Sequence, residues 1–487
     1  MRWLLFFLAA TFQFAIRAEI PAPPAPLREF RGAWVATVAG TDFPRVAGAS
    51  AAVQKAELLG IIERAAALRL NALIFQVRPA GDAFYASAIE PWSPFLTGAM
   101  GRAPEGGWDP LEFAIEQCHE RGIELHAWFN PFRALFGSHY SPASTHVMKE
   151  HAAWCWKYGS DVWMDPGEPG VRDRAKRVIL DVLRRYQVDG IHLDDYFYPY
   201  PVKAHGSVVE FPDDRTWNYY HGAAGQMTRA EWRRSNVDTF IQETYTAIKK
   251  EKPWVLFGIS PFGLWRPNYP EGIGRGALDP YNEIGADSLK WLQKGWCDYF
   301  APQLYWPTKQ NNLSFTTLFN WWLSENTAHR HIWPGMASER VLSDRQPVEI
   351  VREISVTRDH QLDMPCGHIH WNFSALNRNQ GHLADLVNKS CYINYALPPA
   401  TPWLGNYVPP APTLVPEKTR VEWHYSDQRS EQYVKWWLVQ TYEDGKWKSE
   451  VLLPEAEKTA NIPLGTKAVA IRGIGLTGLA GMPSIFW

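Results

Sequence analysis

Cysteine is scarce in this 487-residue chain, and the five that occur are scattered without a Cys-x-x-Cys pair. That spacing is not typical of a zinc site or of a dense disulfide framework. Basic residues are not in excess either, since 49 Lys and Arg stand against 51 Asp and Glu, for a formal net charge of -2. Because no basic stripe is present, the sequence offers no electrostatic basis for binding nucleic acid.

Long apolar runs are missing beyond the N-terminus, so we expect no integral membrane span. The chain begins with MRWLLFFLAATFQFAIRA, in which an early Arg and an apolar run from Trp3 to Ala10 precede the small residue Ala18. This order is typical of a secretory signal peptide over residues 1–18, and it predicts an exported, periplasmic or extracellular protein. Retention of the segment as an N-terminal anchor is the alternative.

Aromatic side chains, by contrast, are abundant, with 25 Trp, 20 Tyr and 23 Phe. Large aromatic residues dominate hydrophobic cores, which accounts for part of this number. The remainder favours a surface on which sugar rings or other flat ligands stack.

Eight apolar, β-branched or aromatic runs recur along the chain, most of them separated by segments with apolar residues at helical spacing. Eight β-then-α units over roughly 350 residues predict an α/β fold, a (β/α)8 TIM barrel covering residues 28–395. A doubly wound open sheet is the alternative, but no Gly-rich phosphate turn follows the first run. The expected strands are 30–38, 70–79, 123–131, 190–197, 254–262, 298–306, 331–337 and 367–373.

The composition changes after about residue 395, where a Pro-rich linker is expected over 396–416. Residues 417–487 then alternate as short strands separated by turn residues such as Asp444 and Gly445. This pattern predicts a small all-β sandwich domain that resembles a fibronectin type III module.

Two adjacent carboxylates, Asp194 and Asp195, end the fourth run in the sequence VDGIHLDDYFYPYP. In a barrel of this kind the site lies at the carboxyl-terminal ends of the strands. Successive side chains alternate across a strand, so Ile191 and Leu193 should pack outward against helices while His192 and Asp194 point inward. Asp195 then begins the loop.

The same alternation brings polar and aromatic groups from other strands toward this end of the barrel, including His370 and Asn372 on the eighth. Buried polar groups cost free energy unless they are paired, so a set of this size favours a binding site over packing. The predicted substrate-binding residues are Gln76, Arg78, His126, Trp128, Asn130, His192, Tyr196, Gln303, Tyr305, Trp306 and Asn372.

Cleavage of a glycosidic bond usually needs a proton donor and a carboxylate that acts as nucleophile or base. Asp194 and Asp195 are the first candidates, and a partner could instead come from Asp82, after the second strand, or from Glu339, after the seventh. Asp298 begins its strand and therefore lies at the opposite end. Loop or cap roles are expected for Asp42 and Asp165.

A metal centre is the competing chemistry, because His126, His192 and His370 could join the two acids around a divalent ion. No HxxH or HExxH spacing supports it, so we expect neither a metal nor a cofactor. The long aromatic segment 202–235, which includes Trp217 and Trp232, is either a lid beside the acids or an excursion that packs on itself.

Several longer runs resemble the glycosyl-hydrolase-like family 10 of bacterial envelope proteins. They are EFRGAWVATV, FQVRPAGDAFYASAIEPWSPFLTG, WDPLEFAIEQCHERGIELHAWFNPFR, DPGEPGVRD, VDGIHLDDYFYP, WRRSNVDTFI, GISPFG and DYFAPQLYWP. The resemblance covers roughly residues 28–395 and implies a (β/α)8 barrel, often followed by a fibronectin-like module. It places the site around Gln76, Arg78, Asn130, Asp194, Asp195, Gln303 and Tyr305. Asp165-Pro166 departs from the Asn-Pro of the family.

The resemblance implies an envelope glycosidase, and one branch of the family cleaves peptidoglycan glycan strands that lack stem peptides. The predicted function is therefore an exported glycoside hydrolase acting on a β-linked N-acetylhexosamine polymer, with such strands as the polysaccharide substrate. Asp194 would be the nucleophile, or would stabilise an oxazolinium-like intermediate, and Asp195 the proton donor, with the reverse order left open. Hydrolysis of another exopolysaccharide, or carbohydrate binding without catalysis, are the alternatives.

Overall fold

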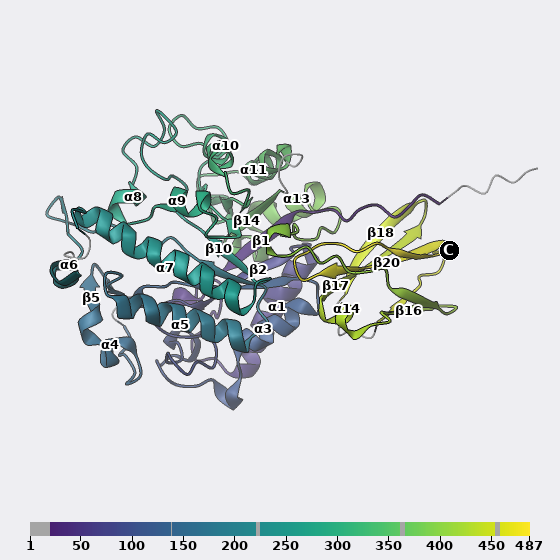
Figure 1. Cartoon of the computed structure of the whole chain (residues 1–487), viewed down its shortest axis with the longest axis horizontal. Helices are drawn as coiled ribbons and strands as arrows, with labels where there is room; N and C mark the ends of the chain where they lie inside the picture. Colours follow the sequence, from purple (N-terminus) through teal and green to yellow (C-terminus); the bar gives the residue numbers. More distant parts are fainter. Residues whose placement is uncertain (1–19, 138, 221–224, 361–365, 453–457) are drawn as a thin grey trace, which may run out of the picture.

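The computed structural model describes residues 20–137, 139–220, 225–360, 366–452 and 458–487. The predicted signal segment 1–18 lies outside these residues. A helix-covered barrel forms one part of the molecule, and a smaller β domain extends from one side of it (Figure 1). No helix within the described ranges is long and apolar enough to cross a membrane.

The barrel strands match the eight predicted runs, with the seventh run divided in two. Its halves, β12 (His331–Ile332) and β13 (Gly335–Ala337), are separated by Trp333 and Pro334. Because β12 pairs with β11 and β13 pairs with β14, this one segment joins the two ends of the sheet and closes the barrel. The other parallel strands are β1 (Phe30–Val35), β2 (Ala72–Arg78), β3 (Glu124–Phe129), β7 (Gly190–Leu193), β10 (Leu256–Ile259), β11 (Tyr299–Phe300) and β14 (Gly367–Trp371).

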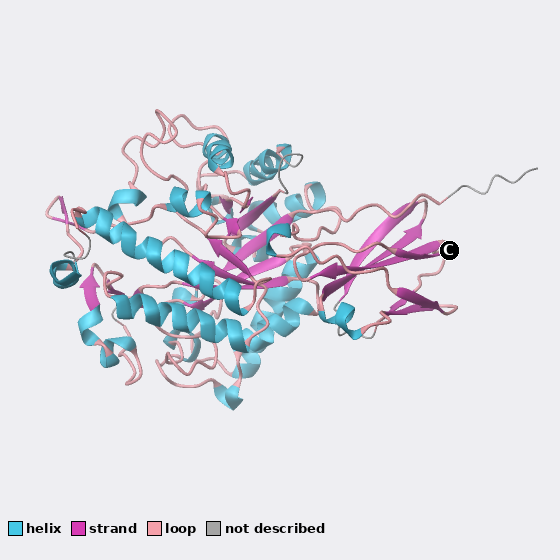
Figure 2. Ribbon diagram, in the orientation of Figure 1, coloured by secondary structure: helices cyan, strands magenta, loops and turns pink. Residues whose placement is uncertain are grey.

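A helix follows each strand and covers the outside of the barrel (Figure 2). Several of these helices begin at side chains that cap the first free backbone N–H groups, such as Ser50, Asp109 and Thr228. The (β/α)8 prediction is therefore confirmed. The covering helices are α1 (Ala51–Ala67), α3 (Pro110–His119), α5 (Pro169–Arg185), α7 (Arg229–Glu251), α9 (Ser288–Gln293), α10 (Phe315–Glu325), α11 (Pro347–Asp359) and α13 (Leu383–Ser390).

Shorter elements lie in the connections between strands and helices. The short helices are α2 (Pro94–Thr97), α4 (Val147–Glu150), α6 (Asp214–Tyr220), α8 (Pro280–Glu283) and α12 (Phe373–Asn377). Between β3 and β7 the chain forms a three-stranded antiparallel sheet of β4 (Arg133–Leu135), β5 (Cys155–Tyr158) and β6 (Asp161–Met164). After β7 it forms a hairpin of β8 (Lys203–Ala204) and β9 (Ser207–Val208).

The interior of the barrel is filled by aromatic side chains, and glycines on neighbouring strands make room for them. A methyl group added at Gly190 would collide with His126, and one at Gly258 would collide with the ring of Tyr299. The interior cluster is separate from the larger core between the strands and the outer helices. It contains Phe30, Trp34, Ala36, Ala72, Ile74, Trp128, Leu256, Tyr299, Ala301, Trp333 and Ile369.

The C-terminal domain consists of two antiparallel sheets that enclose an apolar core around Trp423, Trp437 and Ile471, as predicted for an all-β sandwich. Its resemblance to fibronectin type III and the exact domain boundaries stay predictions. The domain contains β15 (Thr413–Pro416), β16 (Arg420–His424) and β19 (Thr459–Asn461) in one sheet, β17 (Val434–Glu443), β18 (Lys446–Leu452), β20 (Ala468–Gly475) and β21 (Ser484–Phe486) in the other, and the short helix α14 (Gln428–Gln432).

Candidate active site

A pocket of about 180 Å³ opens at the carboxyl-terminal end of the barrel strands. Six of the predicted site residues line it together, and three further lining residues come from β1, β14 and the loop after β10. Both carboxylates of the Asp-Asp pair are in this lining and are almost fully buried, each 4% exposed. The lining residues are Trp34, Trp128, Asp194, Asp195, Tyr196, Ser260, Gln303, Tyr305 and Trp371.

Asp194 is held by three N–H donors. Its Oδ2 accepts hydrogen bonds from Trp128 Nε1 at 3.0 Å and from Asn130 Nδ2 at 3.2 Å, and its Oδ1 accepts one from the backbone N–H of Tyr196 at 3.3 Å. Burial and the adjacent charge of Asp195 together raise the pKa of Asp194 to about 7. This carboxyl group is therefore fixed in orientation and poised to change protonation near neutral pH.

Asp195 has hydroxyl and amide partners instead. The hydroxyl of Tyr200 donates to Asp195 Oδ2. Burial raises the pKa of Asp195, and the hydrogen bonds from Tyr200 and from Gln303 oppose that shift. The amide of Gln303 is itself positioned, because its Nε2 also donates to the carbonyl oxygen of Ser260 at 3.2 Å. Both acids thus have raised pKa values with neutral partners in hydrogen-bond range.

Arg133, which the sequence reasoning missed, orients the same site from the side. Its backbone N–H donates to Asn130 Oδ1 at 2.9 Å, so the Asn130 amide must turn its NH2 group toward Asp194. The Arg133 guanidinium lies 4.6 Å from the centre of the Tyr196 ring, and its charge lowers the pKa of both acids slightly. Arg133 lies beyond the third strand, so strand alternation could not reveal it; the only signal is its place at the end of the NPFR run.

Three tryptophans form the apolar wall of the pocket. The rings of Trp34 and Trp128 each lie 6.0 Å from that of Trp371, in edge-to-face arrangements. Trp34 is absent from the predicted residues because alternation was not applied to the first strand, where the series from Phe30 through Gly32 points it inward. Flat apolar walls beside paired acids are suited to the faces of sugar rings.

Gln76 and Arg78 point inward on β2, but neither lines the pocket. Gln76 Oε1 accepts hydrogen bonds from the backbone N–H groups of Thr37 and Val38, both at 2.9 Å. Arg78 forms a bidentate ion pair with Glu90, with N–O distances of 2.6 and 2.7 Å. In this structure both side chains are engaged in holding loops, and their contact with substrate stays a prediction.

The predicted orientation of the eighth strand is wrong by one residue. On β14 it is Ile369 and Trp371 that face the barrel interior, whereas His370 points outward. The reason is that His368 and His370 both bond through Nε2 to the hydroxyl of Tyr392, in the outer core, and His370 Nδ1 also bonds to Ser338 Oγ at 2.8 Å. Asn372 follows Trp371 and does not line the pocket.

His126 and His192 lie inside the barrel below the pocket and are fully buried. Both bond through Nδ1 to the hydroxyl of Tyr299 at 2.9 Å. Trp306 packs edge-to-face on Phe262 at 5.8 Å, outside the lining. A direct contact of these three predicted binding residues with substrate has no support in their positions.

The rival acids differ in their placement. Asp82 is 1% exposed and accepts hydrogen bonds from Ser93 Oγ at 2.8 Å and from a backbone N–H, so it stabilises its own turn. Glu339 lies in the turn after β13, near Tyr305, and burial raises its pKa to about 7. Burial raises the pKa of Asp82 to about 7 as well, so only its position near the lining residue Tyr305 favours Glu339, which does not itself line the pocket.

Asp298, Asp42 and Asp165 are placed as predicted. Asp298 accepts hydrogen bonds at the opposite end of the barrel, including one from the backbone N–H of Phe257 at 2.8 Å. Asp42 accepts from the backbone N–H groups of Ala36 and Ser374, and Asp165 from that of Gly167. The last two are loop residues.

Comparison with known proteins identifies the relatives of this barrel. Residues 29–349 match the model of the family described as Glycosyl hydrolase-like 10. The chain belongs to this family. It is 35% identical to the glycosyl hydrolase YngK of Bacillus subtilis over 425 residues, which cover 85% of this chain and 81% of YngK. It is also 36% identical to the glycosyl hydrolase DigH of Escherichia coli over 326 residues, 62% of this chain and 72% of DigH.

Family membership makes this chain a glycoside hydrolase, and the fold agrees with solved glycosidase barrels. The catalytic domain of β-amylase from Paenibacillus polymyxa superposes with a TM-score of 0.50 at 10% sequence identity, covering 75% of this chain and 98% of that domain. At this identity the likeness concerns the fold alone.

The described residues of the segment 202–235 contact one another and do not line the pocket. Trp217 and Trp232 contact each other edge-to-face at 5.5 Å, and Asp213 pairs with Arg229 and Arg233. Residues 221–224 lie outside the described ranges. The lid interpretation therefore has no support among the described residues of the segment, none of which lines the pocket.

The metal alternative can also be tested on the side chains. Among the described residues, no group of three or more His, Cys, Asp or Glu is arranged to hold a metal ion. The ring nitrogens of His126 and His192 all bond to protein atoms, and those bonds occupy the positions from which a metal would be coordinated. The donor set at the Asp-Asp pair thus does not fit a metal centre.

Proposed function

We propose that the protein is exported and hydrolyses a β-linked N-acetylhexosamine polymer, with peptidoglycan glycan strands lacking stem peptides as its substrate. The observation that carries the proposal is the pair Asp194 and Asp195, buried at the mouth of a tryptophan-lined pocket with raised pKa values. Glycoside hydrolysis needs acids of this kind. The choice of substrate and the export rest on the family resemblance and on the signal-like segment 1–18.

The hydrogen bonds favour Asp194 as the negatively charged member of the pair. Its partners are the Trp128 indole, the Asn130 NH2 group and a backbone N–H, all of which can only donate, so they favour the carboxylate. A fixed carboxylate can attack the anomeric carbon or stabilise the positive charge of an oxazolinium-like intermediate.

Asp195 suits the role of proton donor. Its partner Tyr200 has a hydroxyl group, which can donate to a carboxylate and accept from a carboxylic acid. The proton on Asp195 can therefore leave and return without losing that hydrogen bond. Because neighbouring acids titrate as a pair, the raised pKa of about 7 belongs to the two carboxyl groups together, and from their hydrogen bonds we expect Asp195 to hold the shared proton near neutral pH.

The rest of the lining accounts for sugar binding. The rings of Trp34 and Trp371 offer apolar faces, and Ser260, Gln303 and Tyr305 offer hydrogen-bonding groups for hydroxyl or acetamido substituents. The lining contains no Lys or Arg, so it favours an uncharged sugar at this position over a phosphorylated or sulfated one.

The test is digestion of a panel of purified glycans, with products identified by mass spectrometry. Peptide-free glycan strands should be cleaved, and glycan strands that retain stem peptides, chitin oligomers and an α-linked glucan should be cleaved more slowly or not at all. Asp194→Asn, shown to be folded by circular dichroism, is the control for contaminating activity. Preference for another glycan would contradict the substrate assignment. Binding of peptide-free strands without any product would contradict catalysis.

A further inference from the structure

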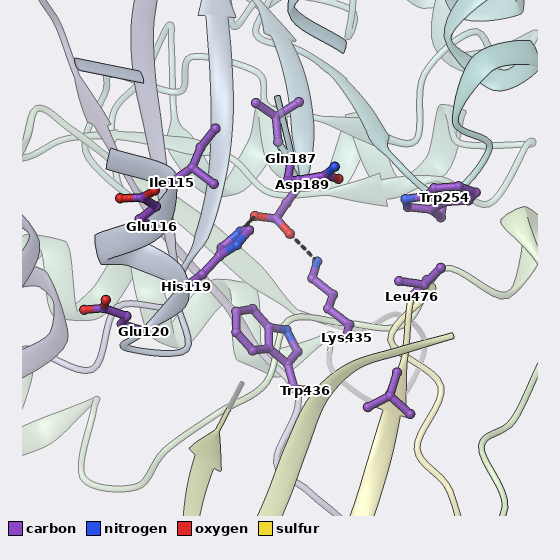
Figure 3. Close-up of a pocket in the computed structure, with 12 residues that line it drawn as sticks. Ile115, Glu116, His119, Glu120, Gln187, Asp189, Trp254, Lys435, Trp436 and Leu476 are labelled. Carbon is purple, nitrogen blue, oxygen red and sulfur yellow. Dashed lines mark hydrogen bonds and ion pairs between the residues drawn. The ribbon is translucent and has the colours of Figure 1, made fainter. Parts of the chain in front are cut away.

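A chain of buried hydrogen bonds connects the C-terminal domain to the wall of the candidate active site. It begins at Lys435 on β17, whose Nζ donates to Glu124 Oε1 at 2.7 Å and lies 2.9 Å from Asp189 Oδ1. Figure 3 shows the Lys435 end of this hydrogen-bond chain, where Lys435 and His119 both reach Asp189 beside a pocket between the two domains. Lys435 thus enters the barrel at the amino-terminal ends of its strands.

From Glu124 the chain continues through the barrel interior. Glu124 Oε2 bonds to His126 Nε2 at 3.1 Å, and the Tyr299 hydroxyl bridges His126 Nδ1 and His192 Nδ1, both at 2.9 Å. The last link joins His192 Nε2 to the indole N–H of Trp34 at 3.1 Å. Trp34 lines the candidate active site, so the chain passes from one end of the barrel to the other.

The two ends of this chain fix the direction of every hydrogen bond in it. Because the Trp34 indole can only donate, His192 Nε2 must accept, and its proton sits on Nδ1 and is donated to Tyr299. The Tyr299 hydroxyl then donates to His126 Nδ1, and His126 donates from Nε2 to Glu124, which accepts as a carboxylate. From Trp34 to Glu124 every donor therefore points away from the active site, and Lys435 donates to Glu124 from the other end.

The barrel interior has space for this chain of hydrogen bonds. His126, His192 and Tyr299 are completely buried, and the room for two of them exists because Gly190 and Gly258 have no side chains. An apolar filling would avoid the cost of desolvating five polar groups. What the polar chain provides, and an apolar core would not, is a directional link between two distant positions.

We propose that Lys435 of the C-terminal domain is a positioning residue for the active site, because it keeps Glu124 ionised and thereby fixes the direction of the hydrogen-bond chain that holds Trp34. The consequence for glycan cleavage rests on the proposed function. Although burial opposes ionisation, the charge of Lys435 lowers the pKa of Glu124 below its usual value. The C-terminal domain thereby becomes part of the catalytic unit.

Loss of this cation allows the chain to reverse. A protonated Glu124 can donate to His126 Nε2, after which His126 donates to Tyr299 and Tyr299 donates to His192 Nδ1. The proton of His192 then sits on Nε2 and faces the indole N–H of Trp34. Two donors cannot bond to each other, so Trp34 leaves its position in the pocket wall.

The experiment uses the full-length protein and four variants, with peptide-free glycan strands as substrate at 25 °C. Lys435→Met and Tyr299→Phe interrupt the chain of hydrogen bonds. Each should lower kcat/KM ten-fold or more, mainly through KM, because Trp34 contacts the sugar. Lys435→Arg keeps the cation and should restore kcat/KM to within three-fold of the parent. Asp189→Asn weakens the same domain contact but leaves Lys435 on Glu124, and should change kcat/KM less than two-fold.

Tyr392→Phe is the matched control for Tyr299→Phe. It also removes a buried hydroxyl that bridges two histidines, His368 and His370, but these do not connect to Trp34. A general loss of stability would lower the activity of Tyr392→Phe and Asp189→Asn as much as that of the chain variants, and that result would overturn the proposal.

A readout independent of catalysis is the tautomer of His192, observed in the ¹⁵N spectrum of histidine-labelled protein and assigned with a His192→Gln variant. We expect the Nδ1–H form in the parent and the Nε2–H form in Lys435→Met. The Nδ1–H form in both would overturn the proposal. If the parent cleaves no glycan, the proposed function fails, while the tautomer still decides whether Lys435 sets the direction of the chain.

Discussion

The two ends of the barrel each bury a pair of carboxylates, but in opposite electrostatic surroundings. At the carboxyl-terminal end, Asp194 and Asp195 have neutral partners, and burial raises the pKa of both. At the amino-terminal end, Glu124 is buried and Asp189 is partly buried, yet the cation of Lys435 overcomes the effect of burial and lowers both pKa values.

Burial alone therefore does not make a carboxylate reactive. The same desolvation produces carboxyl groups with raised pKa values where the hydrogen-bond partners are neutral and the charge of Arg133 only partly offsets burial, and permanently charged anchors where an ammonium group is in contact. In this molecule the ammonium group comes from the second domain. Placing a cation on one pair and not on the other separates a reactive end from a structural end.

The largest effect is expected from removing the proton donor at the reactive end. Asp195→Asn should lower kcat on glycan strands a thousand-fold or more, since general acid catalysis contributes roughly 10²–10⁴-fold. An aryl glycoside with an acidic leaving group needs little protonation, so the variant should lose far less activity on it. Asp194→Asn should lose activity on both substrates. Equal losses on both substrates for Asp195→Asn would reverse the assignment of the two roles.

Removing the Lys435 cation from the structural end should lower the free energy of unfolding by nearly as much as the loss of Asp195 raises the activation free energy. Lys435→Met leaves two buried carboxylates without their ammonium partner, and we expect the free energy of unfolding to fall by about 3–5 kcal/mol. Urea titration followed by tryptophan fluorescence measures the change. Lys448→Met is the matched control, because Lys448 pairs with Glu443 on the exposed surface of the same domain, and its loss should leave the free energy of unfolding nearly unchanged. Equal losses would contradict the comparison.

The barrel itself could be predicted from the sequence because its signals are local. Each of the eight runs carries enough apolar and aromatic residues to be recognised, and alternation placed Asp194 inward because Ile191 and Leu193 mark the outer face clearly. On the eighth strand the apolar Ile369 faces the barrel interior and the two histidines face outward, the reverse of what polarity suggests. What decides that strand is Tyr392, some twenty residues later in the chain.

The partners of the site residues could not be predicted, because they are distant in sequence. Arg78 points inward as expected, but Glu90, from a loop, occupies its guanidinium. The contact between Lys435 and Glu124 joins residues 311 positions apart in the sequence, and no local sequence pattern near either residue predicts it. Alternation thus identified the inward side chains on strands such as β2 and β7, but not on β14, and the tertiary partners decide which inward side chains face the pocket.

The pH dependence of stability should also distinguish the reactive end. The raised pKa of about 7 at the Asp194–Asp195 pair lies above the usual value of 3.8 for Asp, so between these values the folded pair keeps a proton that the unfolded chain has lost. The stability of the parent therefore falls as pH rises through this range, and Asp194→Asn escapes that loss. Relative to the parent, this variant should gain roughly 2 kcal/mol between pH 5 and pH 8, since one pKa unit corresponds to about 1.4 kcal/mol. Urea unfolding at both pH values, with Asp173→Asn as an exposed control, measures the gain.

The smallest effect is expected from the partner of Asp195. Tyr200→Phe removes a hydroxyl that favours the charged form of Asp195, so the pKa of the acid should rise further. The basic limb of the kcat profile should then move to higher pH, while kcat at its maximum falls about ten-fold, the equivalent of one hydrogen bond to a charged group. Tyr158→Phe, which removes a hydroxyl bonded to the carbonyl oxygen of Val209 outside the pocket, should leave the profile unchanged. An unshifted basic limb in Tyr200→Phe would mean that Asp195 does not supply the proton, and that the two acids exchange the roles assigned to them by their hydrogen bonds.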